Sequence, residues 1–256
     1  MPRAEDYAIL FDTSYCTGCR ACQVGCKQWN DLPATETQNR GSYDSLVLSA
    51  HTWLKMSFFE GLDKEGEVYW DFVRTSCMHC TEAACVEACP TGAMNYREGG
   101  VVTVDQDWCI GCRNCVQACP YDAVHYDEEK GVVQKCTLCY DRISNGLEPA
   151  CVKACPTGAL RFGRYGELRA AAEKRVEALK ADGFTDANVY GLKEMGGTHV
   201  IYVLLRHPST YDLPLNPKTQ KEKVAVGWLS AGIAAATLGG LSWIIARREE
   251  LSGGES

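Results

Sequence analysis

The sequence predicts an α+β fold, in which a core of short helices and β-hairpins organised by cysteines is followed by one long apolar helix near the C-terminus. Three observations lead to this class. Sixteen of the 256 residues are cysteine, and they fall into four groups of four. One pattern (Cys, three residues, Cys-Pro, then a turn into an apolar residue) recurs at 85–94, 115–124 and 151–160. Residues 224–246 carry no charge.

The composition argues against nucleic-acid binding, and the first residues give no sign that the thiols are in an oxidising compartment. A formal net charge of −7 argues against a nucleic-acid-binding protein, which is normally basic. The first residues, "MPRAEDYAILFD", show no basic start followed by an apolar run, so no signal peptide is predicted. Export would then require association with a partner that carries the signal.

The elements between and after the cysteine groups are short. "EVYWDFVRTSC" (67–77) and "GGVVTVD" (99–105) predict strands, and "AVHYDEEKGVVQKC" (123–136) predicts a hairpin. "GELRAAAEKRVEALKADG" (166–183) predicts an amphipathic helix that buries Leu168, Ala172, Val176 and Leu179 and stops at Gly183. "THVIYVLLR" (198–206) predicts a strand, and the three prolines within 207–217 predict an extended linker.

These elements predict seven segments. Residues 1–30 and 136–165 form a first ferredoxin-like cluster pair, 31–76 an insert with a lead-in strand, 77–135 a second cluster pair, 166–206 a helix and strand extension, 207–223 a linker, 224–246 a transmembrane helix and 247–256 a tail.

The spacing of the cysteines predicts iron–sulfur clusters. The groups are Cys16, Cys19, Cys22 and Cys26; Cys77, Cys80, Cys85 and Cys89; Cys109, Cys112, Cys115 and Cys119; and Cys136, Cys139, Cys151 and Cys155. The first and third have the C-x2-C-x2-C-x3-C spacing of bacterial ferredoxins, in which three thiolates hold one cubane and the fourth binds another. Sixteen ligands at four per cluster predict four [4Fe–4S] clusters in a double ferredoxin-like core.

Other uses of the thiols explain the spacing less well. Three thiols crowded on one loop are poorly placed for disulfides, and structural zinc sites use two Cys-x2-Cys pairs without interleaved third and fourth cysteines. No C-x-x-C-H haem motif is present. A zinc- or disulfide-stapled scaffold tethered to a membrane remains the alternative from a different class.

The first group alone lacks the proline after its fourth cysteine. Lys27 follows Cys26, and we expect the helix to continue there, because the next 50 or so residues leave the core instead of turning into a hairpin.

Basic residues also lie within the cysteine loops, where they either raise the reduction potentials of the clusters or are solvated surface charges. They are Arg20, Lys27, Arg113, Lys135, Arg142 and Lys153.

The segment Val224–Ala246 is long enough to cross a membrane. At ~1.5 Å per residue, a helix of this length spans a hydrocarbon core of ~30 Å. Trp228 and Trp243 lie near its ends, where indole rings favour the membrane boundary. A buried core helix is the alternative. Basic residues flank both ends, so charge does not predict the orientation.

Nearly the whole chain resembles a known family. "CTGCRACQVGCKQWN", "CMHC", "KCTLCYDRISNGLEPACVKACPTGALRFG" and "GGTHVIYVL" are similar to the iron–sulfur β subunit of molybdopterin oxidoreductases. The match narrows to the β subunit of membrane-bound, quinone-linked formate dehydrogenase, which "EPACVKACPTGA" and residues 196–215 favour over other members.

The resemblance implies that ligands are exchanged between the groups. The implied sets are set I (Cys16, Cys19, Cys22, Cys155), set II (Cys26, Cys136, Cys139, Cys151), set III (Cys77, Cys80, Cys85, Cys119) and set IV (Cys89, Cys109, Cys112, Cys115).

The resemblance also implies partners and a location. It implies a catalytic α subunit with a molybdenum or tungsten bis-pterin site that oxidises formate, and a cytochrome b subunit that passes electrons to quinone. This chain would be a non-catalytic electron-transfer subunit, anchored by one span in the cell membrane with its cluster domain on the periplasmic face. The equivalent subunit of another molybdenum or tungsten reductase, or of a membrane hydrogenase, is the alternative within the class.

Overall fold

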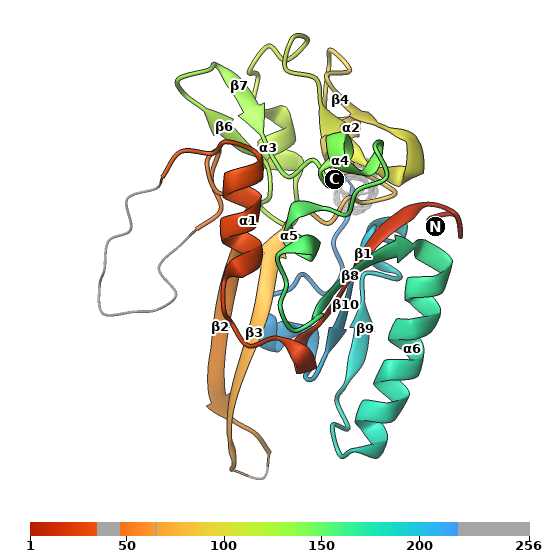
Figure 1. Ribbon diagram of the computed structural model, residues 1–256. Coiled ribbons are helices and arrows are strands. Elements are labelled where there is room, and N and C mark those ends of the chain that lie inside the picture. Colours follow the sequence, from red (N-terminus) through yellow and green to blue (C-terminus); the bar gives the residue numbers. More distant parts are fainter. Residues whose placement is uncertain (35–46, 65, 220–256) are drawn as a thin grey trace, which may run out of the picture. The chain divides into compact units, whose positions relative to one another are not determined.

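A computed structural model describes residues 1–34, 47–64 and 66–219, and residues Met1–Pro217 form one compact unit (Figure 1). Its strands are β1 (Tyr7–Asp12), β2 (Leu54–Leu62), β3 (Val68–Ser76), β4 (Met94–Tyr96), β5 (Val102–Val104), β6 (His125–Asp127), β7 (Val132–Gln134), β8 (Leu160–Arg164), β9 (Asn188–Tyr190) and β10 (Val200–Leu204). Its α-helices are α1 (Ala21–Trp29), α2 (Ala84–Glu87), α3 (Asn114–Ala118), α4 (Tyr140–Ile143), α5 (Ala150–Lys153) and α6 (Tyr165–Ala181).

A four-stranded sheet separates the long helix from the cysteine core. Its strand order is β8-β1-β10-β9, and only β1 and β10 run parallel. Successive side chains of a strand face opposite sides, so Ala8 and Leu10 pack with α6, whereas Ile9 and Phe11 pack with the cysteine-containing core. Because both faces are covered, β1 and β10 are continuous apolar runs.

The helix predicted over 166–183 is confirmed as α6. Leu168, Ala172, Val176 and Leu179 are all buried against the sheet. Gly183, just beyond the helix, has a φ of +100°, a conformation that glycine adopts without strain. The strand predicted over 198–206 is confirmed as β10.

The predicted hairpins are present, and the insert contains one more strand. Gly99 and Gly100, both with positive φ, turn β4 into β5, and the 128–131 turn joins β6 to β7. The predicted lead-in strand is β3, and it pairs along its whole length with β2, which lies within the insert. Figure 1 shows the β2–β3 hairpin extending away from the helices of the cysteine core.

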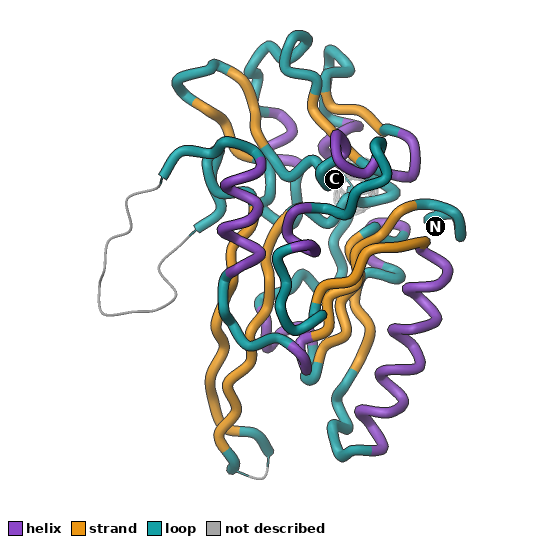
Figure 2. The backbone as a smooth tube through the Cα atoms, in the orientation of Figure 1, coloured by secondary structure: helices purple, strands orange, loops and turns teal. Residues whose placement is uncertain are grey.

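Short helices alternate with loops in the rest of the unit, and loops make up most of the cysteine core (Figure 2). Helix α1 packs against α5, and α2 packs against α3. Cysteine groups that are distant in the sequence are therefore brought together in pairs.

Residues 207–217, which are most of the segment 207–223 predicted to be a linker, instead belong to the compact unit. They contain a 3₁₀ turn, Pro208–Tyr211. Tyr211 is buried because its ring packs on Phe59 and its hydroxyl donates to Asp71 Oδ2 at 2.7 Å. The prolines thus shape a packed turn.

Within residues 1–34, 47–64 and 66–219, no helix combines the length and the apolar character needed to cross a membrane. The predicted span, Val224–Ala246, lies outside the described residues.

Candidate metal centres

Two cysteine loops share one backbone conformation. Gly18 and Arg20 in the first loop have φ of +66° and +61°, and Gly111 and Arg113 in the second have φ of +67° and +62°. These left-handed residues curl each C-x2-C-x2-C segment so that it enters α1 or α3 through an arginine. Each arginine then stacks on an aromatic ring, Arg20 on Phe58 and Arg113 on Tyr126.

In the first half of the core, thiols that are more than 100 residues apart in the sequence are neighbours. Burial raises the pKa of Cys16 to about 11, and Cys155 and Cys19 add to that shift. Burial also raises the pKa of Cys26 well above its ordinary value, and the nearby thiols that add to it are Cys136, Cys151 and Cys139. Cys22 lies between these two groups of thiols, because burial raises its pKa and Cys151, Cys16 and Cys155 all add to that shift.

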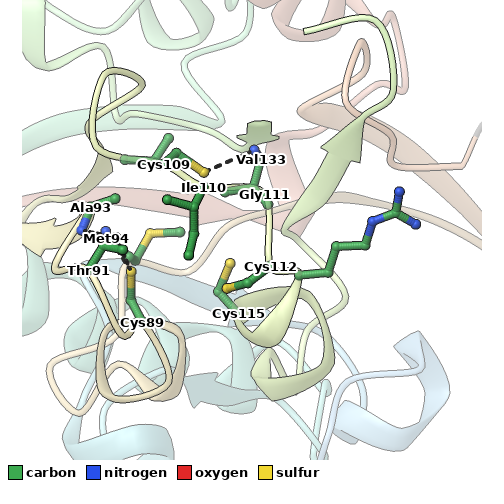
Figure 3. Close-up of a pocket in the computed structure, with 12 residues that line it drawn as sticks. Cys89, Thr91, Ala93, Met94, Cys109, Ile110, Gly111, Cys112, Cys115 and Val133 are labelled. Atoms are coloured by element: carbon green, nitrogen blue, oxygen red, sulfur yellow. Dashed lines mark hydrogen bonds between the residues drawn. The ribbon is translucent and has the colours of Figure 1, made fainter. Parts of the chain in front are cut away.

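The second half has the same arrangement. Burial raises the pKa of Cys80 well above its ordinary value, with further contributions from Cys77, Cys85 and Cys119. Burial raises the pKa of Cys115 to about 11, with contributions from Cys89, Cys109 and Cys112. Figure 3 shows Cys89, Cys109, Cys112 and Cys115 around a common hollow. A second hollow is lined by Cys26, Cys136, Cys139 and Cys151 together with Ile9, Leu54 and Leu138.

The Cys-Pro turns supply hydrogen-bond donors to sulfur. Because each proline reverses the backbone after the cysteine, Met94 N donates to Cys89 Sγ at 3.4 Å and Ala123 N donates to Cys119 Sγ at 3.4 Å. Burial opposes ionisation of Cys89, but hydrogen bonds from the backbone of Met94, Thr91 and Gly92 and from the Thr91 hydroxyl bring its pKa below the ordinary value. Cys155 has a lowered pKa for the same reason. Donors aimed at sulfur stabilise its negative charge.

Cys26 has no proline, and helix α1 continues past it to Trp29, as predicted. The chain then leaves the core through Asn30. The Asn30 Nδ2 group donates to Cys26 O at 2.9 Å and approaches Cys26 Sγ at 3.8 Å. A side-chain amide therefore lies where the Cys-Pro turns place a backbone amide.

The thiols fit iron–sulfur clusters by their chemistry. All sixteen are free, and soft thiolate ligands in groups of four are those that Fe–S clusters require. A buried neutral thiol loses its proton when it binds a metal, so the raised pKa values of the buried thiols do not oppose ligation. Within the described part of the chain, no three His, Cys, Asp or Glu side chains converge as ligands of a single ion. A cubane does not require such convergence, because each thiolate binds a different iron atom.

Two buried cations lie among the thiols. Lys135 Nζ lies 3.8 Å from Cys77 Sγ and donates to the carbonyl oxygens of Cys136, at 2.8 Å, and Val102. Arg74, on β3, is 1% exposed, and its Nε and Nη1 have no hydrogen-bond partner. Lys135 is one of the basic residues that the sequence places within the cysteine loops. Arg74 is not predicted from the sequence, although an arginine in an otherwise strand-forming stretch three residues before Cys77 is a usable signal.

Two family models match the chain. Both describe a 4Fe–4S dicluster domain, and they cover residues 15–93 and 68–165. Together they span all four cysteine groups. The fold and the thiols thus define an iron–sulfur protein built from two dicluster domains.

Several curated relatives extend the match over nearly the whole chain. The formate dehydrogenase iron–sulfur subunit of Haemophilus influenzae is 42% identical, over 94% of this chain and 80% of that protein. The nitrate-inducible formate dehydrogenase iron–sulfur subunit of Escherichia coli is 42% identical, over 92% and 83%. One subunit of the anaerobic dimethyl sulfoxide reductase of Escherichia coli is 43% identical, over 64% and 76%.

This protein belongs to the family of formate dehydrogenase iron–sulfur subunits. It is an electron-transfer subunit of an oxidoreductase complex and is not itself the catalytic subunit.

Proposed function

We propose that sets I to IV each hold one [4Fe–4S] cluster, so that the chain carries four. When bound, such clusters supply centres that each accept and release one electron. The protein's own contribution is to hold four thiols around each centre, to exclude water from most of them, and to direct amide donors at sulfur. The grouping of thiols from distant parts of the sequence supports this proposal.

The observation that carries the proposed function is the linear order of the four sets. Cys22 of set I and Cys151 of set II belong to one packed cluster of buried residues, Cys136 of set II and Cys77 of set III to a second, and Cys85 of set III and Cys115 of set IV to a third. Cys19 and Cys112 are the two exposed cysteines, and they belong to the terminal sets I and IV. A row of centres that is buried in the middle and exposed at both ends suits electron transfer between two partners.

The proposed electron donor is a catalytic α subunit with a molybdenum or tungsten bis-pterin site that oxidises formate. The proposed acceptor is a cytochrome b subunit in the membrane, which passes electrons to quinone. We further propose that Val224–Ala246 anchors the chain in the cell membrane by one span, with the cluster domain on the periplasmic face. The names of the relatives support formate as the substrate, and the uncharged sequence of 224–246 supports the span.

A second candidate is the same role in a sulfoxide reductase, because the sulfoxide reductase relative is as similar as the formate dehydrogenase relatives where it aligns. That similarity covers only 64% of the chain, whereas the formate dehydrogenase relatives cover 92% to 94%. The residues beyond the cysteine core therefore favour formate dehydrogenase.

Purification of the native complex tests the proposal. We expect iron and acid-labile sulfide equivalent to four [4Fe–4S] clusters in this subunit, a co-purifying haem protein, and dye reduction that depends on formate. Zinc in place of iron would refute the cluster assignment. Activity with a sulfoxide and none with formate would show that the chain is the electron-transfer subunit of a sulfoxide reductase, the second candidate.

A further inference from the structure

Arg74 is a buried cation without a carboxylate partner. Its side chain comes from β3, opposite Met56 of β2, and its backbone oxygen accepts from the Tyr202 hydroxyl at 2.9 Å. Among the described residues it forms no ion pair with Asp or Glu. Nε and Nη1 are buried and unpartnered. A buried guanidinium with free donors is unfavourable unless an anion compensates its charge.

Thiols of two sets and the Tyr202 hydroxyl interact electrostatically with the Arg74 guanidinium, and Met56, which pairs with Arg74 across β2 and β3, has its sulfur 3.9 Å from Cys16 Sγ. Burial lowers the pKa of Arg74, but Cys151, Tyr202, Cys136 and Cys22 reverse that effect and leave its pKa above the ordinary value. Cys22 belongs to set I, and Cys136 and Cys151 belong to set II. The guanidinium thus lies at the junction of sets I and II, where the bound clusters and their thiolates would be the nearest negative charge.

Lys135 has the corresponding position at the next junction. It is 1% exposed and lies between Cys77 of set III and the carbonyl of Cys136 of set II. The two buried cations therefore lie on either side of set II. Unlike Arg74, Lys135 donates to two carbonyl oxygens, so its charge is partly satisfied by the protein itself.

We propose that Arg74 is the buried counter-cation shared by the clusters of sets I and II, and that it donates Nε–H and Nη1–H to their sulfur atoms. This inference depends on the proposed function. A positive charge and N–H···S bonds both favour the reduced, more negative form of a cluster, so Arg74 raises the reduction potentials of both centres. Lys135 acts in the same way on the centres of sets II and III.

The test uses the intact complex and the variants Arg74→Gln, Arg74→Lys and Lys135→Gln. Arg169→Gln, on the exposed face of α6, removes the same charge away from the cysteines and is the control. Reductive titration followed by EPR gives the midpoint potentials, and the signals missing from Cys26→Ala identify set II. In Arg74→Gln we expect the potentials of sets I and II to fall while those of sets III and IV stay unchanged. In Lys135→Gln, the midpoint potentials of sets II and III should both fall.

Each outcome decides the question. Unchanged potentials in an Arg74→Gln complex with full iron content would overturn the role of Arg74 and leave the proposed function intact. If Arg74→Gln loses iron, the Arg74→Lys variant shows whether the charge or the shape of the side chain is needed. Iron retained in Arg74→Lys supports the role of a buried cation, and iron lost in Arg74→Lys overturns that role. A wild-type complex without iron and sulfide would overturn both the inference and the proposed function.

Discussion

Gly111 has a residue-specific role in the loop that carries Cys109 and Cys112. Its φ of +67° is a left-handed conformation that costs an L-residue about 1–2 kcal/mol. A Cβ at this position would also overlap the carbonyl oxygen of Gly131 at the tip of the β6–β7 hairpin. The close approach therefore requires glycine both for its backbone conformation and for its lack of a side chain.

We expect Gly111→Ala to displace the loop and to reduce the iron content of set IV. Gly146→Ala is a matched control, because Gly146 also has a positive φ, +73°, but no atom lies within 4 Å of its would-be Cβ. The control should lower stability by only about 1 kcal/mol through backbone strain. Thermal unfolding and iron analysis of both variants measure the difference. Equal losses would show that the approach of Gly131 is unimportant.

For individual residues, the sequence predicts the cysteine ligands better than it predicts the buried side chains around them. Cysteines are recognisable because ligation requires particular spacings along the chain. Arg74 is not recognisable in the same way, since an arginine on a strand is normally solvated and its burial depends on tertiary packing. The burial of Tyr211 escapes prediction for a similar reason: its partner Asp71 is 140 residues away.

Among the elements, helix α1 joins two sets of thiols. Cys22 and Cys26 are four residues apart, about one helical turn, so both face the core. The thiols that act on Cys22 are Cys151, Cys16 and Cys155, whereas those that act on Cys26 are Cys136, Cys151 and Cys139. The lack of a proline keeps this helix intact between the two sets.

Cys26→Ala should therefore abolish the EPR signal of set II and leave set I present. Cys22→Ala is the control and should have the opposite effect. Iron content should fall by about one cluster of four irons in each variant. Loss of the set I signal in Cys26→Ala, with set II retained, would contradict the ligand sets.

The packing of α6 on the sheet gives a prediction about stability. Ala172 is fully buried between the helix and the sheet. A leucine there overfills the contact and should cost about 1–3 kcal/mol. Ala170→Leu, on the exposed side of the same helix, should be nearly neutral. A lower melting temperature of Ala172→Leu alone would agree with this; equal melting temperatures would contradict it.

The regular elements differ in how well they can be predicted. Helix α6 and the hairpins β4–β5 and β6–β7 follow from local periodicity and turn residues. The four-stranded sheet does not, because β1 pairs with β8 and β10, which lie more than 140 residues further along the sequence. The apolar run of β1 shows that the strand is buried, but nothing local identifies its partners.

For the whole compact unit, the arrangement of the four sets determines where partners can receive or deliver electrons. In the proposed order, sets II and III are the inner pair, and the exposed cysteines Cys19 and Cys112 belong to sets I and IV. Trp108 and Ile110, both 67% exposed, lie in the loop of Cys112. Exposed aromatic and apolar side chains beside the proposed terminal centre are typical of a docking surface.

Trp108→Ala should therefore weaken attachment of the redox partner at the set IV end. Buried tryptophans at interfaces commonly contribute about 2 kcal/mol or more, which corresponds to roughly thirtyfold in affinity. Leu147→Ala is the control, because Leu147 is another exposed apolar residue but belongs to the segment after α4 and not to the set IV loop. We expect Trp108→Ala to keep its iron and its EPR signals, because the clusters themselves are unchanged. Formate-dependent quinone reduction should fall, because electron transfer to or from the partner at the set IV end is slowed. Normal turnover in Trp108→Ala, or an equal decrease in both variants, would place the partner elsewhere.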